Sequence, residues 1–269
     1  MAIMNKYIRV MRTSFTDLSA YWGDFIGFLA WGPMSFVLLV IIWSIVYSSN
    51  PQAPDTFNYS INEILGYSLI VTFIGEALLL YKVAWGIQDD NLDGTMTIYL
   101  CRPVNYLSFR FAQILSRSLL STAILLPVVL LLISVMELPI ILDPLILVGF
   151  LISIGIGYIL SFLCFALVGT STFYIRQIWP IRAAFIAIMQ ILGGELLPVD
   201  LLPSVYQSFV RMLPFYLISF MPAQWVLGRI TIEEFVISLI QGVFWILILV
   251  LVTKIVWSHA LKKFESAGG

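Results

Sequence analysis

Six long apolar stretches occupy most of this chain of 269 residues and predict membrane-spanning helices. The hydrocarbon core of a bilayer is about 30 Å thick, and a helix needs about 20 apolar residues to cross it. Six crossings place both chain ends on the same face. The predicted fold is an all-α integral membrane protein whose spans run over Phe25–Tyr47, Ile64–Trp85, Phe111–Val135, Leu145–Gly169, Ile181–Leu197 and Phe235–Trp257.

An amphipathic helix is predicted over residues 3–22, before the first span. Its apolar side chains recur at steps of three or four, which is the spacing of one helix face. Such a helix lies in the membrane interface, so residues 1–24 form an interface segment and residues 25–269 the six-span domain. Two interpretations stay open: a topological anchor, or a hinge that joins a cytoplasmic partner to the spans. The apolar face consists of Ile3, Tyr7, Met11, Phe15, Leu18 and Trp22.

Positive charge is distributed unevenly about the six spans. Only Arg211 and Arg229 fall on one face, and cytoplasmic loops are the ones enriched in Lys and Arg. Both termini are therefore expected in the cytoplasm. The face that carries the termini holds Lys6, Arg9, Arg12, Lys82, Arg102, Arg110, Arg117, Arg176, Arg182, Lys254, Lys262 and Lys263.

Composition excludes several other classes of protein. The chain is 61% hydrophobic and 11% charged, with a mean hydropathy of +1.00, too apolar for a single soluble core. A net charge of −1 gives no reason to expect nucleic-acid binding. Cys101 and Cys164 have no metal-ligand spacing, and His259 is the only histidine. The charged first 24 residues do not resemble a cleavable signal. No phosphate-binding Gly-x-x-x-x-Gly-Lys-Ser/Thr loop occurs, so we expect no enzyme and no cofactor bound by this chain.

The longest polar stretch on the cytoplasmic side is residues 86–105, between the second and third spans. Asn91 or Asp93 could cap a helix there, because a side-chain oxygen accepts an unpaired first-turn N–H. Pro103 would end that helix near Arg102. The sequence thus predicts a short helix at about residues 93–102, off the membrane, with Met96, Tyr99 and Leu100 on one docking face.

Glu76 lies inside the second span, where a carboxylate costs about 2–3 kcal/mol on insertion scales. It either accepts hydrogen bonds from a neighbouring helix or takes part in a transport path, and both readings stay open.

The end of the fifth span is irregular, with Gly193–Gly194 followed by Pro198 and Pro203. The chain nevertheless stays largely apolar to Leu227. Broken backbone at membrane depth survives only where protein or a wet cavity covers it. We therefore expect an outer segment at about residues 195–226, with short re-entrant or interfacial helices over Leu201–Pro222. An ordinary outer loop is the alternative.

Two motifs, in this order about the spans, resemble the membrane subunits of type-2 ABC exporters. The cytoplasmic stretch Asp93–Asn105 is similar to the coupling-helix signature of that family, with Met96 where leucine is usual. The stretch Gly194–Pro203 is similar to the Gly-x-x-x-Pro-x-x-x-Leu-Pro segment after the fifth span. Together with the N-terminal helix, the resemblance covers essentially the whole chain. It looks closest to the group of multidrug or viologen exporter permeases.

The resemblance implies partners and a place in the cell. Two permeases, identical or different, would pair in a bacterial-type inner membrane, surrounded by lipid. Each would bind a separate ATP-binding subunit, which holds ATP and Mg²⁺. The cargo would be hydrophobic or amphipathic.

The resemblance also implies site residues. Coupling to the ATPase would use Asp93, Gly94, Met96, Tyr99, Leu100, Arg102 and Pro103. Glu76 and Gln190 would line the substrate path. Gly194, Glu195, Pro198 and Asp200 would form an outer gate. Two other classes stay open on sequence: an ion-coupled secondary carrier that uses Glu76, and a membrane scaffold that transports nothing.

Overall fold

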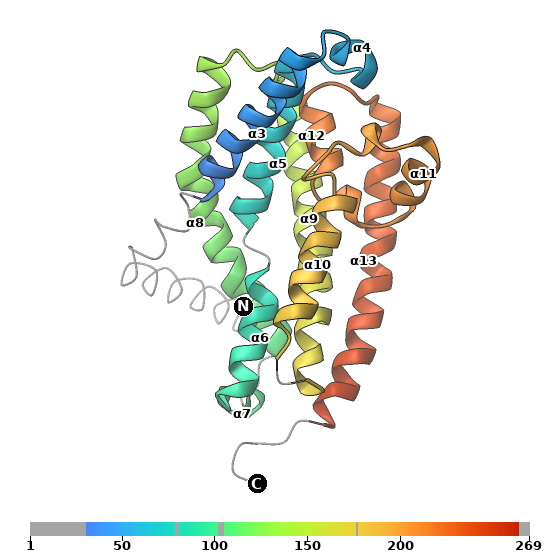
Figure 1. The fold of residues 1–269 in the computed structure, drawn as a ribbon. Helices are drawn as coiled ribbons and strands as arrows, with labels where there is room; N and C mark the ends of the chain where they lie inside the picture. The colour runs from blue at the N-terminus through green and yellow to red at the C-terminus, as the bar shows by residue number, and fades with distance from the viewer. Residues whose placement is uncertain (1–30, 79–80, 102–104, 176, 264–269) are drawn as a thin grey trace.

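The computed structural model describes residues 31–78, 81–101, 105–175 and 177–263, and every regular element in these ranges is a helix (Figure 1). The predicted N-terminal helix and residues 25–30 of the first apolar stretch lie outside these ranges. The longer helices are α3 (Trp31–Ser49), α5 (Ile61–Leu78), α6 (Lys82–Leu92), α8 (Tyr106–Val135), α9 (Pro144–Thr170), α10 (Trp179–Leu192) and α13 (Ile232–Leu261).

Five stretches of the described chain are long and apolar enough to cross a membrane: α3, Ile61–Leu92 over α5 and α6, α8, Pro144–Phe173 over α9, and α13. They confirm an all-α integral membrane protein. Figure 1 shows these helices running side by side between two ends of a bundle. One end carries the short α4 (Ala53–Phe57) and is called the α4 end. The other carries the short α7 (Thr95–Leu100) and is called the α7 end.

The bundle is built around two central helices. α9 packs against α13, α6 and α12 (Phe220–Val226), and α5 packs against α3 and α8. Of the 18-residue apolar windows, 75% of that in Ile61–Leu92 is buried within the protein, against 17% in α3 and 17% in α13. α5 is therefore largely enclosed by its own chain. α3 and α13 leave most of their apolar surface for lipid or another protein.

The second predicted span, Ile64–Trp85, is not one uninterrupted helix, because α5 ends at Leu78 and α6 begins at Lys82. The last carbonyls of a helix lack donors within the helix. Two serines of α8 fill that need: Ser118 Oγ donates to the carbonyl of Leu78, and Ser121 Oγ donates to the carbonyl of Glu76 at 3.3 Å. The end of α5 therefore packs against α8 close to Glu76, the acid that the sequence places inside the second span.

The fifth predicted span, Ile181–Leu197, corresponds to a shorter helix. α10 has 14 residues, about 21 Å at 1.5 Å per residue, which is less than the hydrocarbon core. It ends before Gly193–Gly194, and Gly194 has φ +79°, a left-handed value that glycine adopts without strain. Five spanning stretches are therefore described, and the sixth crossing stays a prediction.

The outer segment contains the predicted short helices. They are η2 (Val199–Leu201), α11 (Ser204–Met212), η3 (Phe215–Leu217) and α12. α12 packs against α9 and α5, and its residues are all buried. The segment therefore folds back into the bundle through α12, which is part of its core, while most of α11 stays exposed.

Candidate functional site

The predicted cytoplasmic helix exists as α7 at the α7 end of the bundle, but its start differs from the prediction. Its N-cap is Gly94, with φ +72° and no side-chain capping bond. Asn91 and Asp93 do not cap it, because α6 continues through Leu92 and Asp93 is the C-cap of α6. Asn91 Nδ2 instead donates to the carbonyl of Thr172, 3.2 Å away. Predicted coupling residues Arg102 and Pro103 lie outside the described residues.

The predicted docking face of α7 is wrong for Met96. This side chain is fully buried in the core of its own chain, and Tyr99 is half-buried against the rings of Tyr106 and Phe109. Leu100 is exposed, and so is Ile98, which the helical pattern did not single out. The surface that α7 offers to another protein is therefore Ile98 with Leu100.

A buried ion pair joins α7 to two longer helices, and sequence analysis missed it. Arg110 of α8 binds the carboxylate of Asp90 on α6, and both side chains are 11% exposed. Tyr106 Oη donates to the same carboxylate at 2.6 Å, and Thr95 Oγ1 of α7 donates to its other oxygen at 3.1 Å. The side chain of Asp90 on α6 thus binds two other helices, α7 and α8.

Arg110 is held by further bonds. Its Nη1 donates to Gln113 Oε1 and its Nη2 to the carbonyl of Gly86, each at 2.6 Å. A Cβ at Gly86 would lie 2.8 Å from Arg110 Nη1, so only glycine admits the guanidinium there. Both carboxylate oxygens of Asp90 and all three guanidinium nitrogens of Arg110 have partners, which is the condition under which a buried ion pair is tolerated.

A cavity of about 560 Å³ lies between α5, α6, α9 and α10. It brings together three residues that sequence analysis named, Glu76, Gln190 and Glu195. The predicted path residues therefore share one space, and Glu195, expected at an outer gate, lines it too. Its aromatic and basic lining consists of Trp31, Tyr81, Trp85, Phe165, Trp179 and Arg182.

The two acids enter this cavity from different elements. Glu195 follows α10, and its backbone N–H donates to the carbonyl of Gln190 at 2.9 Å. Its carboxylate faces Gly75, the residue before Glu76, where an added Cβ would lie 3.9 Å from Glu195 Oε2, and it accepts from Ser219 Oγ at 3.0 Å. Glu76 Oε2 is buried and has no hydrogen-bond partner among the described residues. One expectation from the sequence was that Glu76 accepts hydrogen bonds from a neighbouring helix, and this oxygen accepts none from the described residues.

Arg182 was counted in the sequence only as a cytoplasmic charge. Its side chain is 4% exposed, and its guanidinium lies 4.0 Å from the centre of the Trp85 ring. Its Nη1 has no hydrogen-bond partner among the described residues. Trp85 lies on α6 and Arg182 on α10, with α7, α8 and α9 between them in the chain, so no local spacing signals this contact.

Gly194 fixes the turn that presents Glu195. Its carbonyl accepts from Tyr67 Oη of α5 at 2.6 Å, and a Cβ at this glycine would lie 2.6 Å from the same oxygen. Pro198 is buried shortly afterwards, where it precedes η2. The turn is therefore held against α5 by a buried hydrogen bond.

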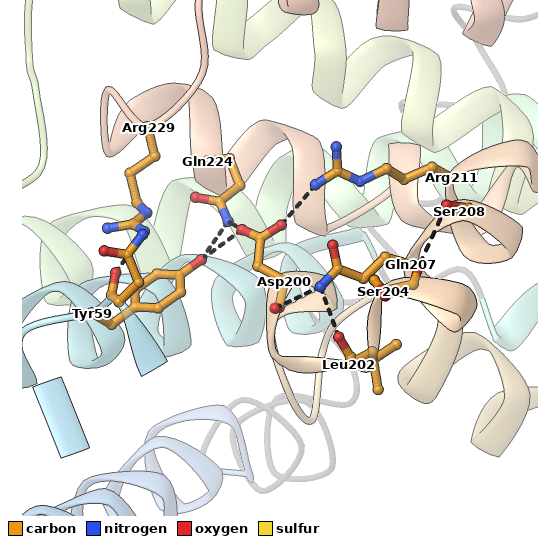
Figure 2. A network of polar contacts seen from close by, with 10 residues as sticks. Tyr59, Asp200, Leu202, Ser204, Gln207, Ser208, Arg211, Gln224 and Arg229 are labelled. Atoms are coloured by element: carbon orange, nitrogen blue, oxygen red, sulfur yellow. Dashed lines mark hydrogen bonds and ion pairs between the residues drawn. The ribbon is translucent and has the colours of Figure 1, made fainter. Parts of the chain in front are cut away.

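Asp200 belongs to a separate polar network at the α4 end (Figure 2). Its Oδ2 accepts from Tyr59 Oη at 3.1 Å and from Gln224 Nε2 at 2.8 Å, and its Oδ1 accepts from Arg211 Nη2 at 2.8 Å. Burial and the neighbouring Asp200 carboxylate raise the pKa of Tyr59 well above its usual value, so the phenol stays a donor. The predicted gate residues thus divide between the cavity and this network.

Arg229 packs over the aromatic ring of Tyr59. Its guanidinium lies 3.7 Å from the centre of the ring, and its Nη1 donates to Glu63 Oε1 at 3.0 Å. Through Glu63 the network reaches the start of α5, and Figure 2 shows Tyr59, which precedes α5, beside Asp200 and Gln224 of the outer segment.

The family model described as "ABC-2 family transporter protein" matches residues 33–268, nearly the whole chain. The chain belongs to the ABC-2 transporter family. It is a multi-pass membrane permease of an ABC transporter, the transport subunit and not the ATPase, and membership implies association with an ABC ATP-binding subunit. No curated protein matches the chain.

Proposed function

We propose that this ABC-2 permease is the membrane half of an ATP-driven exporter. Two permeases, identical or different, pair in a bacterial-type inner membrane with both termini in the cytoplasm. Each binds a separate ATP-binding subunit at the α7 end, and that subunit holds ATP and Mg²⁺. The cargo is hydrophobic or amphipathic and passes by the cavity that Glu76, Gln190 and Glu195 line.

The main support for this proposal is that α7 exposes two apolar side chains in a chain that belongs to the ABC-2 family. Ile98 is 54% exposed and Leu100 is 39% exposed on a helix that lies at the tip of the bundle (Figure 1). Apolar side chains on a short helix are what a groove in a partner protein binds. They support a docking role for this end.

The links behind α7 support a mechanical route to the cavity. Thr95 of α7 binds Asp90 of α6, and Asp90 binds Arg110 of α8. Trp85 lies on the same helix as Asp90 and lines the cavity. A push on α7 by the closing ATP-binding subunits would therefore move α6 and α8 together, and α6 would change the cavity.

Co-purification tests this function. The permease carries an affinity tag and is expressed with a candidate ABC ATP-binding subunit, as wild type and as Ile98→Asp/Leu100→Asp. Two charges on the docking surface should abolish co-purification, because each would have to be desolvated at an apolar interface. Met96 is left intact, since a charge there would disrupt the core.

A matched control separates docking from folding. Val205→Asp/Phe209→Asp places the same charges on two exposed apolar side chains of α11, at 78% and 58% exposure, outside the α7 end. This variant should retain the ATP-binding subunit. Retention of the subunit by Ile98→Asp/Leu100→Asp would place the contact elsewhere, and no co-purification with the wild type would remove the exporter assignment.

A further inference from the structure

Two ionisable side chains of opposite sign line the same cavity, and each has a buried atom without a hydrogen-bond partner among the described residues. They are Glu76, through Oε2, and Arg182, through Nη1. Buried polar groups in native proteins are almost always paired, and each exception calls for an explanation. Ionisable side chains inside a membrane are costly and mark functional sites. The two orphan atoms therefore point to a ligand that both could bind.

The two charges do not satisfy each other. No ion pair joins them among the described residues. Gln190, whose carbonyl holds the Glu195 backbone, follows Arg182 by eight residues on α10, about 12 Å along the axis. Glu195 in turn lies beside Gly75, the neighbour of Glu76. The cavity therefore has an acidic end, at Glu76 and Glu195, and a basic end at Arg182.

Nearby groups leave these ends available. At the acidic end, Glu195 accepts one hydrogen bond, from Ser219, and the positive charge of Lys82 on α6 acts on the Glu76 carboxylate through space. At the basic end, Arg182 stacks on Trp85, and the Asp89 carboxylate acts on it through space without forming an ion pair. Neither end is closed by a hydrogen-bonded counter-charge from the described part of the chain.

The walls between the two ends are apolar. They are formed by α9 and α10 and by the outer segment, through Phe165, Ala183, Ile186, Met189 and Ile218. Binding sites for small molecules have this composition, with mostly hydrophobic walls and a few placed polar groups that orient the ligand. An apolar body would fill the middle while polar groups reach the two ends.

We propose that this cavity binds an amphipathic zwitterion, with its cationic group at Glu76 and Glu195 and its anionic group at Arg182. The inference rests on the proposed transport function and names the class of its cargo. A ligand with a cation alone would meet Arg182 as a like charge and leave its Nη1 unpaired. A zwitterionic lipid headgroup, whose two charges are linked by a short spacer, does not span the ends. The site therefore favours a molecule whose two charges are separated by an apolar body.

A matched pair of dyes tests the assignment. Rhodamine B carries a delocalised cation and a carboxylate, and its ethyl ester keeps the cation and lacks the carboxylate. Fluorescence anisotropy would follow each dye as the wild-type permease in phosphatidylcholine nanodiscs is added, with empty nanodiscs as the blank. We expect rhodamine B to bind about tenfold more tightly than its ester, the effect of one charge-assisted hydrogen bond.

Variants assign each end. Arg182→Gln should remove the preference for rhodamine B and leave the affinity for the ester unchanged or higher, while Arg182→Lys, which keeps the charge, should retain the preference. Glu76→Gln should weaken binding of both dyes. Lys262→Gln, an exposed cation just after α13, should change neither.

Three outcomes would overturn the proposal. Equal affinity of the wild type for both dyes would mean that the cavity recognises the cation alone and not the carboxylate. If the Arg182→Gln variant still prefers rhodamine B over its ester, Arg182 is not the residue that binds the anionic group of the ligand. Absence of binding in phosphatidylcholine, itself a zwitterion in large excess, would assign the cavity to lipid or to no ligand. If the ATP-binding subunit still co-purifies with the wild type in these cases, the proposed function stands and only the cargo class fails.

Discussion

The guanidinium of Arg110 on α8 binds the carboxylate of Asp90 on α6 in the interior of the α7 end. The two residues are 20 positions apart, and the bond joins the helix that lines the cavity to a membrane-length helix. Both side chains are 11% exposed. Neither can reach water without the helices separating.

Neutralising one member of this pair should destabilise the permease. Asp90→Asn leaves Arg110 buried without its counter-charge, and breaking a buried pair in this way costs about 3–5 kcal/mol. We expect a clear fall in the apparent melting temperature of the purified protein in detergent. Arg110→Gln should act similarly.

The matched control is Asp93→Asn, three residues away and exposed, which should leave the melting temperature unchanged. The double variant Asp90→Asn/Arg110→Gln should lose less stability than the two single losses added together, because neither charge remains unpaired. Additive losses would mean that the two residues do not act as a pair.

The ion pair also shows where sequence analysis stops. The apolar stretches predicted the bundle, because membrane helices need long apolar runs whatever they pack against. Asp89, Asp90 and Asp93 form an acidic run that looks solvated in the sequence. Only the packing of α8 beside α6 reveals that Asp90 is buried, since its partner comes from a different helix.

For α7, too, the sequence predicts the helix but not which of its side chains are buried. A helix at about residues 93–102 could be predicted with Pro103 as its limit, although the expected caps, Asn91 or Asp93, were wrong and the N-cap is Gly94. Which of its faces meets the protein could not be predicted, because Met96, Ile98 and Leu100 are all apolar. The orientation is set by the bond from Thr95 to Asp90 and by the burial of Met96.

The cavity was predictable in part. Glu76 and Gln190 were expected to line one substrate path, and both line this cavity; the path itself stays a prediction. Arg182 was not expected there, because a cation near the end of an apolar stretch normally reaches the membrane surface. The Trp85 ring holds it inside instead.

Gly194→Ala should destabilise the turn that presents Glu195. At φ +79° an alanine is strained, and its Cβ would lie 2.6 Å from the Tyr67 hydroxyl oxygen. Left-handed backbone costs a residue with a Cβ about 1–2 kcal/mol before any clash. The measurement is the apparent melting temperature, which should fall. Gly155→Ala, where a Cβ would meet nothing within 4 Å, should leave it unchanged. Equal values for the two variants would contradict the strained turn.

Ser118→Ala should weaken the contact between α8 and the end of α5. The serine hydroxyl donates to the carbonyl of Leu78, which lies at the last residue of its helix. Hydrogen bonds between membrane helices contribute about 0.6–1.7 kcal/mol, so a small fall in the apparent melting temperature is expected. Ser134→Ala is the control on the same helix, because Ser134 bonds only to the carbonyl of Leu130 within α8. A fall as large in the control would show that the effect is not specific to the α5 contact.

Asp200→Ala should release the outer segment from the start of α5. The substitution removes the acceptor of Tyr59 and Gln224, whose donors are buried, and of the ion pair with Arg211 (Figure 2). The buried donors dominate the cost, about 1–3 kcal/mol each when left unpaired, because the ion pair is half-exposed and such pairs contribute little. The apparent melting temperature should therefore fall for Asp200→Ala and much less for Arg211→Gln. Asp55→Ala, an exposed acid at the same end, should have no effect. Equal losses for Asp200→Ala and Arg211→Gln would mean that the surface ion pair, and not the buried bonds to Tyr59 and Gln224, holds the segment in place.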